Sequence, residues 1–152
     1  MSLLGSRRTR LTTLAVGLAA MAAPALSQPA SAAVQSCQFV LKSVKAVDVQ
    51  ETGTRGDEII IRLDGERFPS AGFVRFPTNN TTRAAISFGS PVKQFADDNP
   101  LTVRLFEVDT LLDDAIGTTK NLECTGSQTN QVLVFKETGV DYRMTYDVKL
   151  LG

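Results

Sequence analysis

The chain has 152 residues, with 16 basic and 16 acidic side chains that give a formal net charge of zero, and it contains two cysteines but no histidine and no tryptophan. Without histidine, a serine or cysteine nucleophile lacks its usual imidazole base, and zinc lacks an imidazole ligand. The balanced charge gives no electrostatic reason to bind DNA or RNA. We therefore do not expect an enzyme, although a hydrolase built on paired carboxylates stays open as a less favoured alternative.

Residues 1–32 have the three-part organisation of a secretory signal peptide. Three arginines and no acid precede the apolar run LTTLAVGLAAMAAPAL, and Ala30-Ser31-Ala32 fits a cleavage signal of the A-x-A type. The apolar run is short for a membrane anchor. We expect a secreted, extracellular protein that is cleaved after Ala32, with one domain over residues 33–152 and no transmembrane segment in that domain. Cleavage would remove three of the 16 basic residues and none of the 16 acidic ones, so this domain has a net charge of −3.

Beyond residue 36 the hydrophobic pattern has the period of two that is typical of β-strands. The pattern is clearest near the C-terminus, where apolar side chains alternate with polar ones over residues 141–151. Asp-Gly, Asn-Pro and Thr-Gly pairs separate the segments, as turns require. Strands are expected at residues 39–49, 58–63, 72–76, 83–88, 101–108, 131–137 and 141–151. About seven to nine short strands with regular turns predict an all-β fold, an antiparallel β-sandwich or a small barrel, and we favour the sandwich.

Cys37 and Cys124 are the only cysteines of the chain, and both follow the expected cleavage site. In an oxidising compartment a lone pair of cysteines is most simply a disulfide. The alternative is a lipid-modified N-terminus at Cys37, which Gln35 and the distance from the apolar run disfavour. We therefore predict a disulfide that joins the start of the domain to a late loop.

Two segments between expected strands are rich in carboxylates. ETGTRGDE contains Glu51 and Asp57, and LFEVDTLLDDAIGTT contains Glu107, Asp109 and Asp114. Carboxylates this close repel one another unless water or a cation separates them. Calcium is bound by about six to eight oxygen atoms, chiefly from such loops. The alternative is that both segments are ordinary solvated turns, in which Asp and Gly are favoured residues.

Both segments resemble the calcium-binding loops of C2 domains, which are calcium-dependent phospholipid-binding modules. In that family an acid, a Gly-bearing loop and an Asp lead into an apolar strand, as in ETGTRGDEIIIRL. In its other calcium loop an acid-x-acid pair ends a strand, and an Asp precedes Ile-Gly, as in LFEVDTLLDDAIGTT. The resemblance implies a C2-like sandwich with calcium as its cofactor and with the ligands Glu51, Asp57, Glu107, Asp109 and Asp114. The sequence departs from the family at Glu51 and Glu107, where Asp is usual.

Leu111 and Leu112 occupy the tip of the second acidic segment. The resemblance implies that they contact a membrane or a partner surface, and the alternative is that they fold back onto the sandwich. Taken together, the sequence favours a secreted calcium-binding module, similar to exported bacterial proteins, that contacts a surface, a lipid or a protein. The alternative function is a metal-free secreted inhibitor, for example of a protease, in which the irregular stretch 64–100 supplies a rigid loop.

Overall fold

The structure is a computed structural model that describes residues 33–51, 55–109 and 113–152. The expected leader, 1–32, and the two leucines Leu111 and Leu112 lie outside the described residues. The described residues form one compact unit. Among the described residues there is no helix with the length and apolar character needed to cross a membrane.

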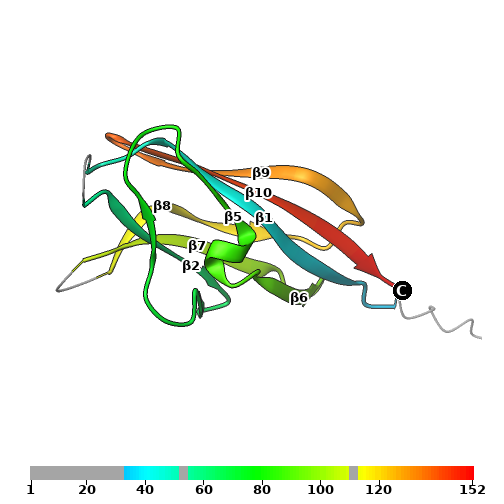
Figure 1. Ribbon diagram of the computed structural model, residues 1–152. Coiled ribbons are helices and arrows are strands. Elements are labelled where there is room, and N and C mark those ends of the chain that lie inside the picture. Colours follow the sequence, from blue (N-terminus) through cyan, green and yellow to red (C-terminus); the bar gives the residue numbers. More distant parts are fainter. Residues whose placement is uncertain (1–32, 52–54, 110–112) are drawn as a thin grey trace, which may run out of the picture. The chain divides into compact units, whose positions relative to one another are not determined.

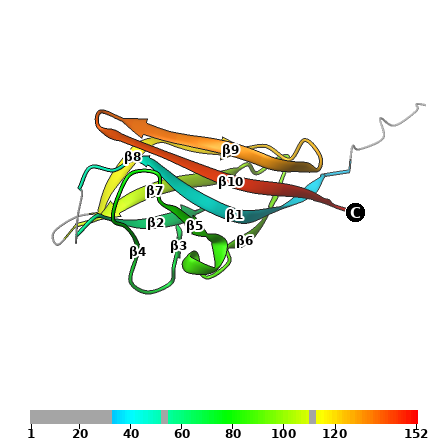
Figure 2. The same cartoon turned by 45° about the horizontal axis from the view of Figure 1, so that its top comes forward.

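The described residues form ten strands in two five-stranded antiparallel sheets, which stack face to face as a sandwich (Figures 1 and 2). One sheet has the order β5-β1-β10-β9, with β6 also paired to β1, and the other has the order β3-β2-β7-β8, with β4 also paired to β2. The strands are β1 (Ser36–Asp48), β2 (Asp57–Leu63), β3 (Glu66–Phe68), β4 (Val74–Phe76), β5 (Thr82–Ala84), β6 (Val92–Ala96), β7 (Leu101–Val108), β8 (Asp113–Leu122), β9 (Gln128–Glu137) and β10 (Val140–Leu151), with a short 3₁₀ helix η1 (Ala85–Phe88). The predicted antiparallel β-sandwich is confirmed.

The core lies between the sheets and is made of aliphatic and aromatic side chains that alternate along each strand. On β2 and β7 the inward rows include Ile59, Ile61 and Leu105, and on the facing β10 they include Tyr142 and Met144, all of them fully or almost fully buried. Burial of this apolar surface is the main stabilising contribution to such a fold. The β-branched run on β2 suits a pleated surface, which is why this segment forms a central strand.

All seven strands expected from the sequence are present, but one of them ends well before its expected end. Three further strands were not expected. The strand expected at 83–88 ends at Ala84, because residues 85–88 turn into η1, which Gly89 closes in the left-handed conformation at φ 79°. The missed strands are β3, β6 and β8. They show weak alternation, since β3 has three residues and β8 buries only Ile116 and Leu122. The irregular stretch 64–100 therefore holds several short strands and η1 in addition to loops.

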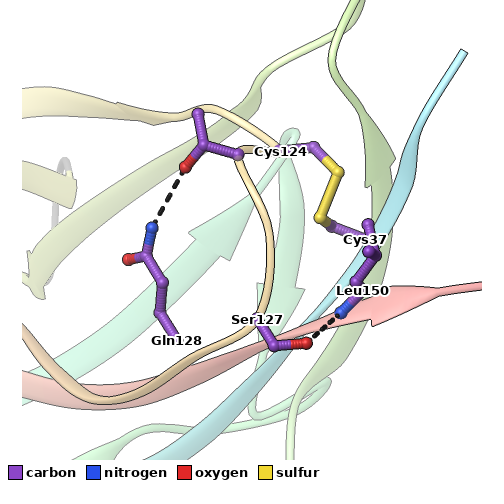
Figure 3. Close-up of a disulfide and its surroundings, with 6 residues drawn as sticks. Cys37, Cys124, Ser127, Gln128 and Leu150 are labelled. Carbon is purple, nitrogen blue, oxygen red and sulfur yellow. Dashed lines mark hydrogen bonds between the residues drawn. A yellow bond between two sulfur atoms is a disulfide. The ribbon is translucent and has the colours of Figure 1, made fainter.

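The predicted disulfide is present between Cys37 and Cys124 (Figure 3). Cys37 belongs to β1 and Cys124 follows β8, so the bond ties the two sheets together, with a Cα–Cα distance of 5.5 Å. Both cysteines are buried. Nearby, the backbone N–H of Leu150 donates to Ser127 Oγ over 2.9 Å (Figure 3). The bond therefore closes the end of the sandwich at which β1 begins and β10 ends.

Candidate functional site

The other end of the sandwich carries both carboxylate-rich segments. There β1 ends at Asp48 and β2 begins at Asp57, while β7 ends at Val108 and β8 begins at Asp113. These four strand ends lie together on the left of Figure 1, opposite the C-terminus. They bring together the carboxylates of the predicted site, which we call the acidic pole: Glu51, Asp57, Glu107, Asp109 and Asp114.

Two of these carboxylates continue the inward, core-facing rows of their strands. Asp57 precedes Ile59 on β2, and Glu107 follows Leu105 on β7, each by the two residues that return a side chain to the same face. The strand register places Glu107 opposite Ile59 on one side and opposite Asp114 of β8 on the other. The acidic pole thus occupies the end of the core, where apolar residues give way to carboxylates.

Glu107 is the electrostatic centre of the acidic pole. Burial, and then the negative charges of Asp57, Asp109, Glu51 and Asp114, together raise the pKa of the Glu107 carboxyl to about 7. All four other predicted residues therefore act on this one group. A cation placed among them would relieve the repulsion and favour the ionised form of Glu107.

A cavity of about 530 Å³ opens beside Glu107. Its polar lining includes both acidic and basic side chains, the basic ones being Arg55 and Arg75. Arg75 forms an ion pair with Glu58. The lining residues are Glu51, Arg55, Gly56, Glu58, Arg75, Glu107, Val108 and Asp109. The loops at this end therefore enclose space that is large enough for a hydrated ion or a small polar group.

The carboxylates of the acidic pole influence Glu107 electrostatically, but they do not form a preformed metal-binding site. Within the ranges that the structure describes, no three acidic, histidine or cysteine side chains are grouped closely enough to hold a metal ion. The charges of the carboxylates act on Glu107 from a distance, whereas a metal ion needs its ligands in direct contact. The described side chains therefore do not form a metal-binding site in advance. Glu51 and Asp109 are exposed, so changes of side-chain rotamer are open to both of them.

Asp57 differs from the other carboxylates because it is completely buried. Its Oδ1 accepts a hydrogen bond from the backbone N–H of Glu51 over 2.7 Å, and its Oδ2 accepts one from the N–H of Gln50 over 3.0 Å. Oδ2 also accepts a bond from the Tyr142 hydroxyl over 2.7 Å. Asp57 thus links the β1–β2 loop to a strand of the opposite sheet.

The alternating pattern identifies Tyr142 only as a core residue of the last strand. Burial, and then its hydrogen bond to Asp57, raise the pKa of the Tyr142 phenol, which therefore stays protonated and donates. Its ring meets the ring of Phe76 edge-on, with 5.3 Å between the ring centroids. The hydroxyl of a buried tyrosine usually has a hydrogen-bond partner. A tyrosine in the inward row of β10 therefore indicates a buried acceptor, although the sequence does not say which residue it is.

Two further contacts fix the backbone beside the acidic pole. Gly56 has a positive φ of 56°, and a Cβ at this position would lie 2.4 Å from the carbonyl oxygen of Phe76, so no other residue fits. Asn79, in the loop between β4 and β5, accepts from the Val49 N–H and donates to Asp48, both over 2.9 Å. A third loop is thereby tied to the end of β1.

A row of arginines crosses the outer face of the sheet that carries the site. The strand register places Arg62 of β2 opposite Arg67 of β3 and opposite Arg104 of β7. Arg62 and Arg104 lie over the ring of Phe106, at 5.0 and 4.6 Å from its centroid. Arg62 also pairs with Asp113 over 2.9 Å. Like charges directly opposite one another are unfavourable in a sheet, so this row is a candidate surface for an anionic partner.

Comparison with known proteins bears on the fold. A structure titled as the two C2 domains, A and B, of extended synaptotagmin 2 matches with a TM-score of 0.51 and 14% identity, over 93% of this chain and 48% of that one. The fold resembles that of C2 domains. The chain spans about half the length of that structure. No family model matches the sequence, and no curated protein matches it either.

Two further solved structures with C2 titles are similar at lower scores. A structure titled as a C2 domain has a TM-score of 0.45 and 13% identity, over 78% of this chain and 99% of that one. The first C2 domain, domain A, of a plant extended synaptotagmin 1 has a TM-score of 0.44 and 9% identity, over 77% of this chain and 94% of that one.

Proposed function

We propose that this protein is a secreted, non-catalytic binding module that takes up calcium at the acidic pole and thereby contacts an anionic surface. The observation that carries the proposal is the convergence of carboxylates from two distant loops on Glu107. Burial, and then the charges of these neighbours, raise the pKa of the Glu107 carboxyl to about 7. Such an arrangement is costly for the cation-free protein, and a bound divalent cation removes that cost.

Calcium suits the donors at the acidic pole. Hard divalent cations take oxygen ligands, and carboxylates on loops are the commonest source of them. Glu51 and Asp109 are exposed at the cavity, and Glu107 and Asp114 face each other across β7 and β8. We assign these four carboxylates to the ion, with water and backbone oxygens completing its coordination. Asp57 belongs to the same predicted set, and its role is considered separately below.

An anionic partner, such as a surface of acidic phospholipid, fits the charges of the sheet that carries the site. A bound cation would offset part of the negative charge of the acidic pole and so weaken its repulsion of an anionic surface. Arg62, Arg67 and Arg104 add positive charge on the outer face of that sheet. Arginine matches phosphate well because its guanidinium presents a planar fork of donors.

The proposed secretion rests on the sequence of the leader and on the disulfide. The organisation of residues 1–32 is that of a signal peptide. Cys37 and Cys124 form a disulfide, and disulfides persist mainly in oxidising compartments such as the extracellular space. Export would therefore place the acidic pole in surroundings where calcium is plentiful.

Calcium is expected to stabilise the folded protein. At about 100 times its dissociation constant, a ligand that binds only the native state adds about 2.7 kcal/mol, which raises the melting temperature of a domain of this size by roughly 10 °C. Asp109→Asn replaces a proposed anionic ligand with a neutral amide and should abolish the rise. Asp98→Asn alters an exposed carboxyl in the turn after β6 and should preserve it. Titration calorimetry without heat, together with an unchanged melting temperature at millimolar calcium, would falsify calcium binding.

Vesicles test the proposed partner. The protein should sediment with vesicles of acidic phospholipid when calcium is present, and should stay in the supernatant with chelator or with vesicles of neutral phospholipid. Arg62→Gln combined with Arg104→Gln should weaken sedimentation several-fold. Arg143→Gln, which alters an exposed arginine of the opposite sheet, is the matched control. Equal sedimentation with and without calcium would rule out the proposed coupling of the ion to the partner.

A further inference from the structure

Asp57 is the one carboxylate of the acidic pole whose hydrogen-bonding capacity is largely used inside the protein. It is fully buried, and the described residues place no lysine or arginine in an ion pair with it. Its charge is compensated by three donors, namely two loop amides and one phenol. A carboxylate offers about four lone-pair positions, so Asp57 retains roughly one for any further ligand.

The three donors come from different parts of the fold. Gln50 and Glu51 belong to the β1–β2 loop, and Tyr142 lies on β10 in the opposite sheet. The amide that donates to Asp57 Oδ1 belongs to Glu51, which is itself a proposed calcium ligand. The position of the Glu51 backbone, and hence the reach of its side chain, therefore depends on Asp57.

We propose that Asp57 is a positioning residue and not a calcium ligand, and that Tyr142 is its anchor in the opposite sheet. This inference rests on the proposed function, and it assigns the direct coordination to Glu51, Glu107, Asp109 and Asp114. Direct coordination by Asp57 would require an ion to approach oxygens at which the positive ends of N–H and O–H dipoles already point. Keeping these bonds is favourable, because they satisfy buried polar groups.

Asp57 still contributes to the electrostatics of cation binding. Its negative charge acts on the Glu107 carboxyl, so it attracts a cation to the acidic pole from its buried position. Loss of the charge therefore weakens cation binding even without loss of a ligand. For this reason affinity alone does not separate the two roles, and the test needs a count of the ligands at the ion.

The number of water molecules on a bound lanthanide supplies that count. Terbium takes oxygen ligands as calcium does, and its luminescence lifetimes in light and heavy water report the coordinated waters. Asp109→Ala removes a proposed ligand and should add at least one water. Asp57→Ala, measured at a temperature where the variant is folded, should weaken terbium and calcium binding about tenfold but leave the water count unchanged. An added water in Asp57→Ala, equal to that in Asp109→Ala, would overturn the inference and make Asp57 a ligand.

Tyr142→Phe tests the anchor without changing any carboxylate. It removes one hydrogen bond to Asp57 and should lower calcium affinity about three- to tenfold in calorimetry at a temperature where the variant is folded, again with an unchanged water count. Tyr146→Phe is the matched control, since Tyr146 is a buried tyrosine of the same strand that stacks on Phe39, and its calcium affinity should equal that of the wild type. Wild-type affinity in Tyr142→Phe would show that Tyr142 has only a structural role, and would overturn the anchor.

The same measurements separate the inference from the function on which it rests. If the wild-type protein binds neither calcium nor terbium, the proposed function fails and the inference fails with it. If the wild type binds both ions and only the result for Asp57→Ala or Tyr142→Phe differs from expectation, the inference alone fails. Circular dichroism of each variant at the measuring temperature establishes that the comparison is between folded proteins.

Discussion

Replacing both cysteines by alanine, as Cys37→Ala with Cys124→Ala, is expected to lower the free energy of unfolding by about 4 to 5 kcal/mol. The bond closes a loop with a sequence separation of 87, and a cross-link of this span restricts the unfolded chain strongly. The loss is comparable to the whole stability of many domains of this size. Urea unfolding of the wild type and the double variant, followed by circular dichroism, measures the difference.

The location of the disulfide provides an internal control for this measurement. Cys37 lies at the start of β1 and pairs in register with Leu150 near the end of β10, which is the end of the sandwich opposite the acidic pole. Calcium affinity of the folded double variant should therefore match that of the wild type, even though its stability is much lower. A loss below about 1 kcal/mol would contradict the chain-entropy account. It would mean that the unfolded chain is already compact without the bond.

The sequence allowed the fold to be predicted because local pattern and tertiary role agree over most of the chain. The alternating residues 141–151 and the β-branched run 58–63 became β10 and β2, two central strands. The prediction was wrong at 85–88, where Ala-Ile-Ser-Phe reads as the end of a strand but η1 forms. It also missed β8, which buries only two of its residues and pairs with β7.

Spacing along the chain and the resemblance to C2 domains named five carboxylates as one set, and the charges of four of them act on the fifth, Glu107. Their role as metal ligands stays a prediction, and the sequence did not distinguish the separate role of each carboxylate. The burial of Asp57 depends on Tyr142, which lies 85 residues away in the sequence. The row formed by Arg62, Arg67 and Arg104 likewise depends on strand register. Both features depend on contacts between strands that are far apart in the sequence, so no short sequence pattern predicts either of them.

Asp57→Ala is expected to destabilise the folded protein by about 3 to 5 kcal/mol. The substitution leaves the Tyr142 hydroxyl and the amides of Gln50 and Glu51 without their acceptor, and each buried donor without a partner costs about 1 to 3 kcal/mol. Relief of the repulsion with Glu107 offsets a part of this cost. Asp98→Ala, at an exposed carboxyl, should change stability by no more than about 0.5 kcal/mol.

A double-mutant cycle shows whether the loss follows from the bond between Asp57 and Tyr142. Tyr142→Phe alone removes one hydrogen bond to a charged group, which is expected to cost about 1.5 to 3 kcal/mol. In the Asp57→Ala background the same change should cost far less, because the hydroxyl no longer has an acceptor, and the coupling energy should be at least about 1 kcal/mol. Additive losses would mean that the two residues stabilise the fold independently. The sheets would then be held together at this end by apolar packing, such as that between Tyr142 and Phe76.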